Sequence, residues 1–195
     1  MVATFSVSHC YGMAGARIGF LGGPPAFVRG CLRVKAALTR LNTSLIAQHG
    51  ALAALRDPGY LAYAQGVVRR NLEHLDATLA ATPGVVLGAR PVRGLACGLD
   101  VSGAGITAQE LMVALFARKI AVYPGDGLGD TGAATTVRLN LSRPDPWAME
   151  LLRTALPEAV AEVQSGRWRE PVAALLDGKG TERATRLAAT VRAAG

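Results

Sequence analysis

The chain has 195 residues, enough to bury a sizeable core, and 50% of them are hydrophobic, as in globular proteins. Its formal net charge of +7 comes mostly from arginines spread singly along the chain, and only 5% of the residues are aromatic. A nucleic-acid-binding surface needs clustered basic residues, preferably with aromatic side chains between them. We therefore expect no nucleic-acid partner.

Membrane insertion, secretion and metal binding are not expected either. No apolar run reaches the roughly 18 residues of a transmembrane helix, and the N-terminus shows no basic stretch followed by an apolar one. The three cysteines, Cys10, Cys31 and Cys97, form no C-x-x-C pair, and the three histidines have no metal-ligand spacing. This pattern is typical of reduced thiols in a cytoplasmic protein.

Hydrophobic periodicity and turn residues predict an α/β chain. In chain order we expect a strand over 2–7, helices over about 25–41, 45–55 and 60–81, strands over 85–87 and 95–101, a helix over 108–118, strands over 120–123 and 135–141, and a helix over 147–164. The clearest boundary signals are the turn Asp57-Pro58-Gly59 and the capping box from Thr107 to Glu110.

The last thirty residues carry no pattern with an evident chemistry. Ser165-Gly166 and Gly178-Lys179-Gly180 interrupt any regular element. Thr181 can cap a weakly amphipathic helix that runs to Val191. We expect a frayed or partner-contacting tail.

The segment over residues 5–20 contains the side chains best suited to bind an anion. Ser6 and Ser8 would lie on one side of the predicted strand, because side chains alternate along a strand. The glycines that follow permit close backbone approach, and Arg17 adds a positive charge. Two hydroxyls and a guanidinium that converge would form a phosphate site. The alternative is that the serines are ordinary strand hydroxyls and that Arg17 pairs with an acid.

This segment resembles a motif of the class I and II aminotransferases, which are fold-type I enzymes that use pyridoxal 5'-phosphate (PLP). The family motif is S-x-S-K, a glycine-rich turn and R-x-G. The likeness continues in Q-x-x-A-L-x-x-L from Gln48, D-P-x-Y-L from Asp57, P-G-x-x-x-G from Pro124 and V-R-L-N-L-S from Val137. It covers roughly residues 1–165, which correspond to the second half of such an enzyme.

The resemblance implies a fold and a set of site residues. Residues 1–57 would be a partial PLP-binding large domain, and residues 58–195 the small domain, with a C-terminal extension from about residue 166. Ser6, Ser8 and Arg17 match the residues that hold the cofactor phosphate. Arg138 matches the arginine that binds the substrate α-carboxylate, which a guanidinium can grip with two parallel hydrogen bonds.

The family lysine that forms the Schiff base with the cofactor falls on His9. An imidazole cannot form a stable Schiff base, so PLP would be held noncovalently. With an ordinary pKa near 6.5, His9 can still act as a general acid or base. Some sugar dehydratases of the same superfamily resemble this case, with histidine at that position and PLP held noncovalently. The alternative is that catalysis was lost together with the lysine, which leaves His9 as a packed polar residue.

The first half of an aminotransferase supplies a second phosphate-binding loop, the aromatic that stacks on the cofactor ring and the aspartate that pairs with the ring nitrogen. None of these is found here. We therefore expect the C-terminal half of a split or truncated enzyme for an amino acid or related amine, not competent in transamination by itself. A partner chain would supply the N-terminal half, and a homo- or hetero-oligomer is expected. The alternatives are a non-catalytic interaction or regulatory subunit, or a degenerate fragment.

Overall fold

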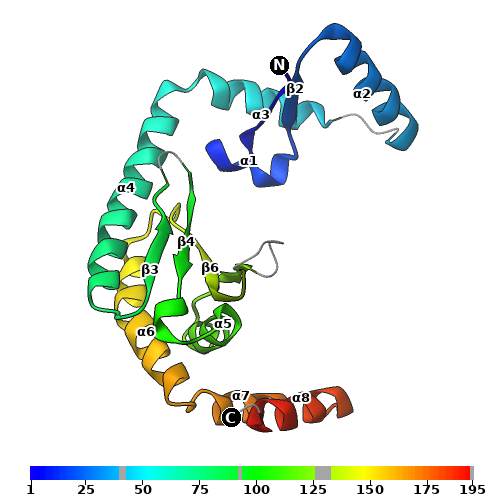
Figure 1. The fold of residues 1–195 in the computed structure, drawn as a ribbon. Helices are drawn as coiled ribbons and strands as arrows, with labels where there is room; N and C mark the ends of the chain where they lie inside the picture. The colour runs from blue at the N-terminus through cyan, green and yellow to red at the C-terminus, as the bar shows by residue number, and fades with distance from the viewer. Residues whose placement is uncertain (40–42, 92–93, 126–132, 194–195) are drawn as a thin grey trace. The chain divides into compact units, whose positions relative to one another are not determined.

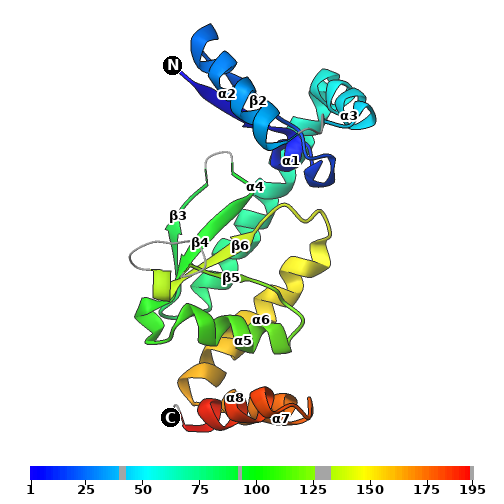
Figure 2. The ribbon, with the colours of Figure 1, turned by 90° about the vertical axis from the view of Figure 1, so that its right-hand side faces the viewer.

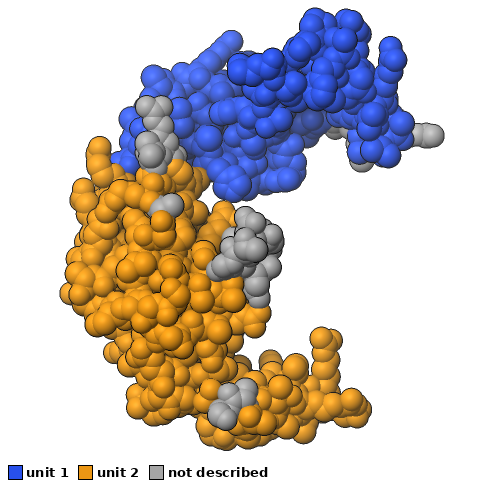
Figure 3. Space-filling view, viewed as in Figure 1, with its two compact units in different colours: residues 1–66 blue, residues 67–195 orange. Residues whose placement is uncertain are grey.

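The computed structural model describes residues 1–39, 43–91, 94–125 and 133–193 (Figure 1). Its helices and strands form two compact units, residues 1–66 and residues 67–195 (Figure 3). Helix α4 (Pro58–Ala80) begins in the first unit and continues into the second. None of the described helices is both long and apolar enough to span a membrane.

The first unit holds short elements around a small core. Its elements are β1 (Ala3–Ser6), α1 (Val7–Cys10), the 3₁₀ turn η1 (Ala14–Ala16), β2 (Gly19–Gly22), α2 (Pro25–Leu38) and α3 (Leu45–Arg56). Strands β1 and β2 are antiparallel, with Phe5 opposite Phe20, and every residue of both strands is exposed. Only Val7, Ile18 and Ala51 form a buried cluster in this unit. Few apolar contacts within the chain therefore stabilise it.

The second unit is an antiparallel sheet covered by helices. Its elements are β3 (Val86–Ala89), β4 (Ala96–Asp100), η2 (Ser102–Ala104), α5 (Ala108–Ala117), β5 (Tyr123–Pro124), η4 (Ala133–Thr135), β6 (Thr136–Asn140), α6 (Pro146–Gln164), α7 (Arg169–Asp177) and α8 (Glu182–Ala193). The strand order is β3-β4-β6-β5. Helices α4 and α6 lie along the same face of this sheet (Figures 1 and 2).

Residue alternation decides which side chains of the sheet enter the core. In β4 and β6, Cys97 pairs with Leu139 and Leu99 with Val137, and all four are buried in the cluster that includes α4, α5 and α6. Arg138 lies between Val137 and Leu139, so its side chain projects from the opposite face. Burial raises the pKa of the Cys97 thiol to about 11, so this thiol stays protonated at neutral pH.

The predicted α/β class and most predicted elements are confirmed, including the capping box. Thr107 Oγ1 accepts a hydrogen bond from the Glu110 amide at 3.2 Å, and the Glu110 carboxylate accepts one from the Thr107 amide at 2.9 Å. The predicted helix end at Leu41 lies outside the described residues.

The strand predicted over 120–123 is wrong in its extent, because β5 contains only Tyr123 and Pro124. Lys119 adopts a left-handed conformation, with φ of 67°, at the end of α5. The Ile120 amide then donates to the Leu115 carbonyl at 3.0 Å. That amide caps the helix and is not available to a strand ladder.

The C-terminal tail, expected to be frayed, forms two helices that pack on each other. Ala173 of α7 and the pair Ala184 and Ala188 of α8 are buried, since small side chains allow close helix packing. Arg192 donates to Glu170 and Asp177 across the two helices, at 2.9 to 3.1 Å. The cap predicted at Thr181 is present, as its hydroxyl oxygen accepts from the Ala184 amide at 3.2 Å.

Candidate functional site

Ser6 and Ser8 are brought together by a single turn of helix. Ser6 ends β1 and caps α1, because its Oγ accepts a hydrogen bond from the Ser8 amide at 3.1 Å. The same hydroxyl donates to the Ile18 carbonyl at 3.2 Å. Ser8 therefore lies on the helical turn, and the predicted alternation of the two serines along a strand is wrong. The cap starts the helix before the strand can reach Ser8.

Arg17 lies close to this turn along the backbone. The Val7 amide donates to the Ile18 carbonyl at 3.4 Å, and Ser6 pairs with Gly19 in the β1–β2 register. These bonds attach the segment that carries Arg17 to the one that carries Ser6 and Ser8. The predicted grouping of the three residues along one backbone ladder is thus what the fold supplies.

The backbone of Arg17 is in the left-handed region, with φ of 52° and ψ of 44°. That conformation costs a non-glycine residue about 1–2 kcal/mol. Lys119 shares it, but there it closes the end of α5. For Arg17, the side chain donates from Nη1 to the Ala14 carbonyl at 3.0 Å, and the guanidinium remains exposed with further N–H groups to donate.

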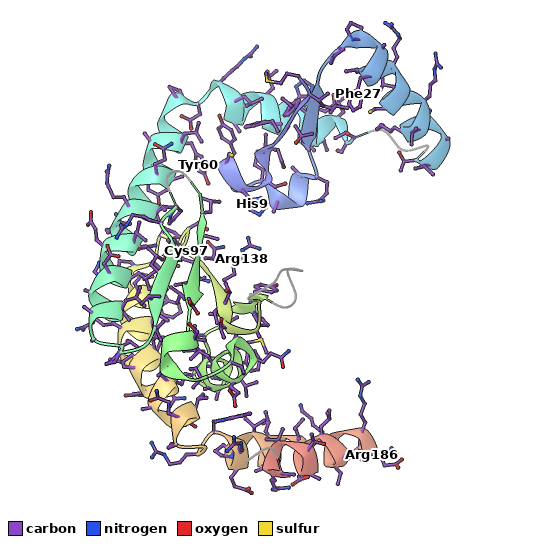
Figure 4. The ribbon with its side chains drawn as sticks, viewed as in Figure 1. His9, Phe27, Tyr60, Cys97, Arg138 and Arg186 are labelled. Carbon is purple, nitrogen blue, oxygen red and sulfur yellow. The ribbon has the colours of Figure 1, made fainter. Side chains whose placement is uncertain are left out.

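His9 is the third residue of α1 and is exposed within this chain (Figure 4). The alternative of a packed polar residue does not describe it here. Its neighbours Ser8 and Cys10 are partly buried and exposed, respectively. An exposed imidazole on the same turn as Ser8 is accessible to a small molecule.

Two residues that the sequence analysis did not single out hold this turn in place. Tyr60, in the first turn of α4, stacks on Tyr11 with ring centroids 5.9 Å apart and an angle of 19° between the planes. Gly12 has φ of 65°, and a Cβ placed there would be 2.6 Å from Tyr60 Oη. The D-P-x-Y-L motif contains Tyr60, but nothing in the motif indicates what its ring contacts.

Arg138 belongs to the second unit and lies on the exposed face of its sheet (Figure 4). Its cross-strand neighbours are Gly98 in β4 and Tyr123 in β5. Gly98 has no side chain to cover the guanidinium, and Tyr123 is 68% exposed. Among the described residues Arg138 has no hydrogen-bond or ion-pair partner, unlike the surface salt bridge that was its alternative. It is therefore available to a carboxylate.

Asn71 fixes the chain that leaves β6. It is 2% exposed, and its Nδ2 donates to the Leu141 carbonyl at 2.9 Å and to the Arg143 carbonyl at 2.7 Å. A polar residue on the apolar stripe of α4 is the signal that could have identified it. The glycines of the P-G-x-x-x-G motif at 127 and 129 lie outside the described residues.

These residues fit the phosphate of PLP in part. Arg17 offers a free, exposed guanidinium, and Ser8 offers a hydroxyl close to it along the chain. Ser6 would have to release the Ile18 carbonyl before its single hydroxyl hydrogen could reach a phosphate oxygen. Within the described ranges no three His, Cys, Asp or Glu side chains gather in a way that could hold a metal ion.

Comparison with known proteins places the chain in a family. The family model of aminotransferase class I and II matches residues 1–156. Histidinol-phosphate aminotransferase 2 from Gluconobacter oxydans (strain 621H) is 40% identical over 57 residues, which are 29% of this chain and 16% of that protein.

Solved aminotransferases share the fold. Histidinol-phosphate aminotransferase from Sinorhizobium meliloti, in complex with PLP, has a TM-score of 0.69 at 22% identity, over 83% of this chain and 41% of that one. A PLP-dependent aminotransferase from Streptococcus suis 89-1591 has a TM-score of 0.70 at 20% identity, over 83% of this chain and 42% of that one. The chain thus spans about two-fifths of the structures it matches. With most of its length matched by the family model, the chain belongs to the class I and II aminotransferases, a family of PLP-dependent enzymes.

Proposed function

We propose that this chain is the C-terminal half of a PLP-dependent, aminotransferase-like enzyme that acts on an amino acid or related amine. Residues 1–57 are then the remnant of the large domain, and residues 58–195 the small domain with its extension from about 166. The observation that carries the proposal is the conformation of Arg17. A strained, exposed arginine in a unit with little core indicates a backbone kept for binding and not for packing.

The roles of the first-unit residues follow from their chemistry. Arg17 binds two phosphate oxygens of PLP, and Ser8 donates a hydroxyl hydrogen to a third. Ser6 keeps the turn capped and joins the phosphate site only by turning its hydroxyl away from Ile18. When bound, PLP supplies the electron sink that weakens the bonds at the substrate α-carbon.

His9 and Arg138 act on the substrate in this proposal. Arg138 binds the α-carboxylate and so orients the amino acid. His9 takes the proton from the α-carbon, or returns it, through one imidazole nitrogen. Because an imidazole cannot replace the lysine amine in the Schiff base, PLP is held noncovalently, and a lyase or dehydratase reaction is more consistent with His9 than transamination.

The remaining part of the site comes from a second polypeptide. The chain spans only 41–42% of the solved aminotransferases that it matches, and the ring-binding residues of the family have no counterpart in it. The chain alone therefore does not transaminate. The second candidate function, a non-catalytic interaction or regulatory subunit, is favoured by the replacement of the lysine by His9.

The two functions are separated by adding PLP to the purified chain and recording the cofactor's near-ultraviolet and visible absorbance, together with an assay of common amino acids and 2-oxo acids. We expect weak, noncovalent PLP binding and no turnover. Sustained 2-oxo acid formation by the isolated chain would overturn the claim that it is incomplete. No spectral change at all would favour the non-catalytic subunit.

A further inference from the structure

Helix α2 presents an apolar surface with no partner in the described part of the chain. None of its residues is buried. Four of its apolar side chains recur every three or four residues, and at 3.6 residues per turn they lie within about 60° of one another around the helix axis. This set, which we call the α2 stripe, consists of Phe27, Cys31, Val34 and Leu38.

The stripe is exposed along its whole length (Figure 4 labels Phe27). Phe27 is 47% exposed, Val34 57% and Leu38 78%. An amphipathic helix with a continuous apolar stripe normally packs that stripe against another element. The surface is therefore an interface whose other side is absent.

The strands beside α2 have the same deficiency. A two-stranded sheet has a free edge on each strand, and an isolated hairpin is marginally stable in water. The Phe5 and Phe20 rings, 6.0 Å apart, are 43% and 46% exposed. Both features call for a partner that supplies further strands and an apolar layer.

The charge of the first unit limits what that partner can be. Residues 1–66 contain six lysine and arginine residues and a single acidic residue, Asp57. Helix α2 has Arg29, Arg33 and Lys35 around the stripe and no acidic residue. A second copy of the chain would bring the same positive charge to the interface, whereas an acidic surface would be attracted to it.

We infer that the α2 stripe is the docking surface for a separate polypeptide that carries the N-terminal half of a class I and II aminotransferase, with acidic residues beside its own apolar contact. This inference rests on the proposed function, because it names the partner that completes the site. It adds the contact surface and the charge of the partner.

The test is co-expression of this chain with a tagged N-terminal part of the Gluconobacter oxydans histidinol-phosphate aminotransferase 2, up to the first residue that aligns with this chain. Sedimentation then measures the complex and the isolated chain. We expect a one-to-one complex, weakened at least a hundredfold by Val34→Glu. The matched variant Ala36→Glu adds the same charge on the opposite side of α2 and should change affinity less than threefold. Circular dichroism checks that both variants keep the helix.

Three results would overturn the inference: no complex with this probe, a complex equally sensitive to both variants, or a dimer of the isolated chain that Val34→Glu dissociates. PLP binding measured on the same samples keeps the two proposals apart. If the complex fails but Arg17-dependent PLP binding persists, only the docking surface is wrong. If the complex forms and binds no PLP, the proposed function fails and the docking surface stands.

Discussion

At the scale of single residues, the candidate site is a turn held by backbone contacts. Gly12, Tyr11 and Tyr60 hold the turn from one side, and the Ser6 cap fixes where the helix begins. The site residues themselves contribute little to this framework. Ser8, His9 and Arg17 can therefore be replaced without loss of the turn, which makes their roles open to direct test.

Gly12→Ala tests whether the turn positions the site. Alanine in a left-handed conformation costs about 1–2 kcal/mol, and its methyl group would also press on Tyr60 Oη. We expect the Val7 and Tyr11 amides, both hydrogen-bonded in this turn, to exchange with solvent roughly five- to thirtyfold faster. Gly15→Ala is the control, because a Cβ at Gly15 meets nothing within 4 Å. Equal exchange rates in the two variants would show that Gly12 is not a constraint.

His9→Lys tests what lies beside residue 9. If PLP is bound there, a primary amine held close to the cofactor carbonyl should form a covalent link. We expect a new visible absorbance band that borohydride removes, leaving the cofactor mass on residue 9. The link should form when the N-terminal half is present, and little or none should form without it. His49→Lys, on the exposed face of α3, is the control and should give no link. PLP binding without a link at residue 9 would mean that the role of His9 is wrong.

At the scale of elements, local sequence signals and long-range contacts differ in what they reveal. The capping box at Thr107 and the amphipathic pattern of α4 are contained in a few neighbouring residues, so they could be predicted. The short β5 could not, because its length depends on the left-handed Lys119 and on the use of the Ile120 amide. The packing of α7 on α8 was missed because alanine-rich helices have a weak apolar pattern. In the site, the residue types were predictable from a motif, whereas the contacts of Tyr60 and Asn71 join segments distant in sequence.

Asn71→Leu should weaken the second unit. The change leaves the Leu141 and Arg143 carbonyls without their donor, and an unsatisfied buried group costs about 1–3 kcal/mol. We expect the free energy of unfolding in urea to fall by about 2–4 kcal/mol for the two bonds together. Thr78→Val is the control, since the buried Thr78 hydroxyl bonds only to the His74 carbonyl of its own helix. If Thr78→Val destabilises the protein as much, the two carbonyl contacts of Asn71 have no special weight.

The α7–α8 pair should lose its ion-pair stabilisation in acid. The hydrogen bond from Arg192, and then its charge, hold the pKa of Glu170 below its usual range. A lowered folded-state pKa contributes stability above the ordinary glutamate value, and that stability is lost as pH falls through the lowered value. We expect Arg192→Gln to speed hydrogen exchange in α7 and α8 at neutral pH and to have no effect near pH 2. Arg186→Gln, which breaks a pair within α8 alone, should have a smaller effect. An effect of Arg192→Gln that persists in acid would contradict the ion-pair explanation.

At the scale of the whole molecule, the chain divides its candidate residues between two units. The first holds Ser6, Ser8, His9 and Arg17 with a small core, and the second holds Arg138 on a well-packed sheet. The stability of the second unit comes from its own core, while the first has an apolar helix surface and strand edges left over. This asymmetry is what a chain that spans about two-fifths of its solved relatives would show if its remaining contacts belonged to another polypeptide.

The central claim, that this chain retains the phosphate site of the family, is tested most directly by the dissociation constant for PLP of the purified chain and of Arg17→Ala. Loss of a hydrogen bond to a charged group costs about 1.5–3 kcal/mol, so Arg17→Ala should weaken PLP binding roughly ten- to a hundredfold. Arg33→Ala removes the same charge from the exposed side of α2 and should leave the constant unchanged. Equal affinity in the wild type and Arg17→Ala would contradict the claim and show that the site is a remnant without function.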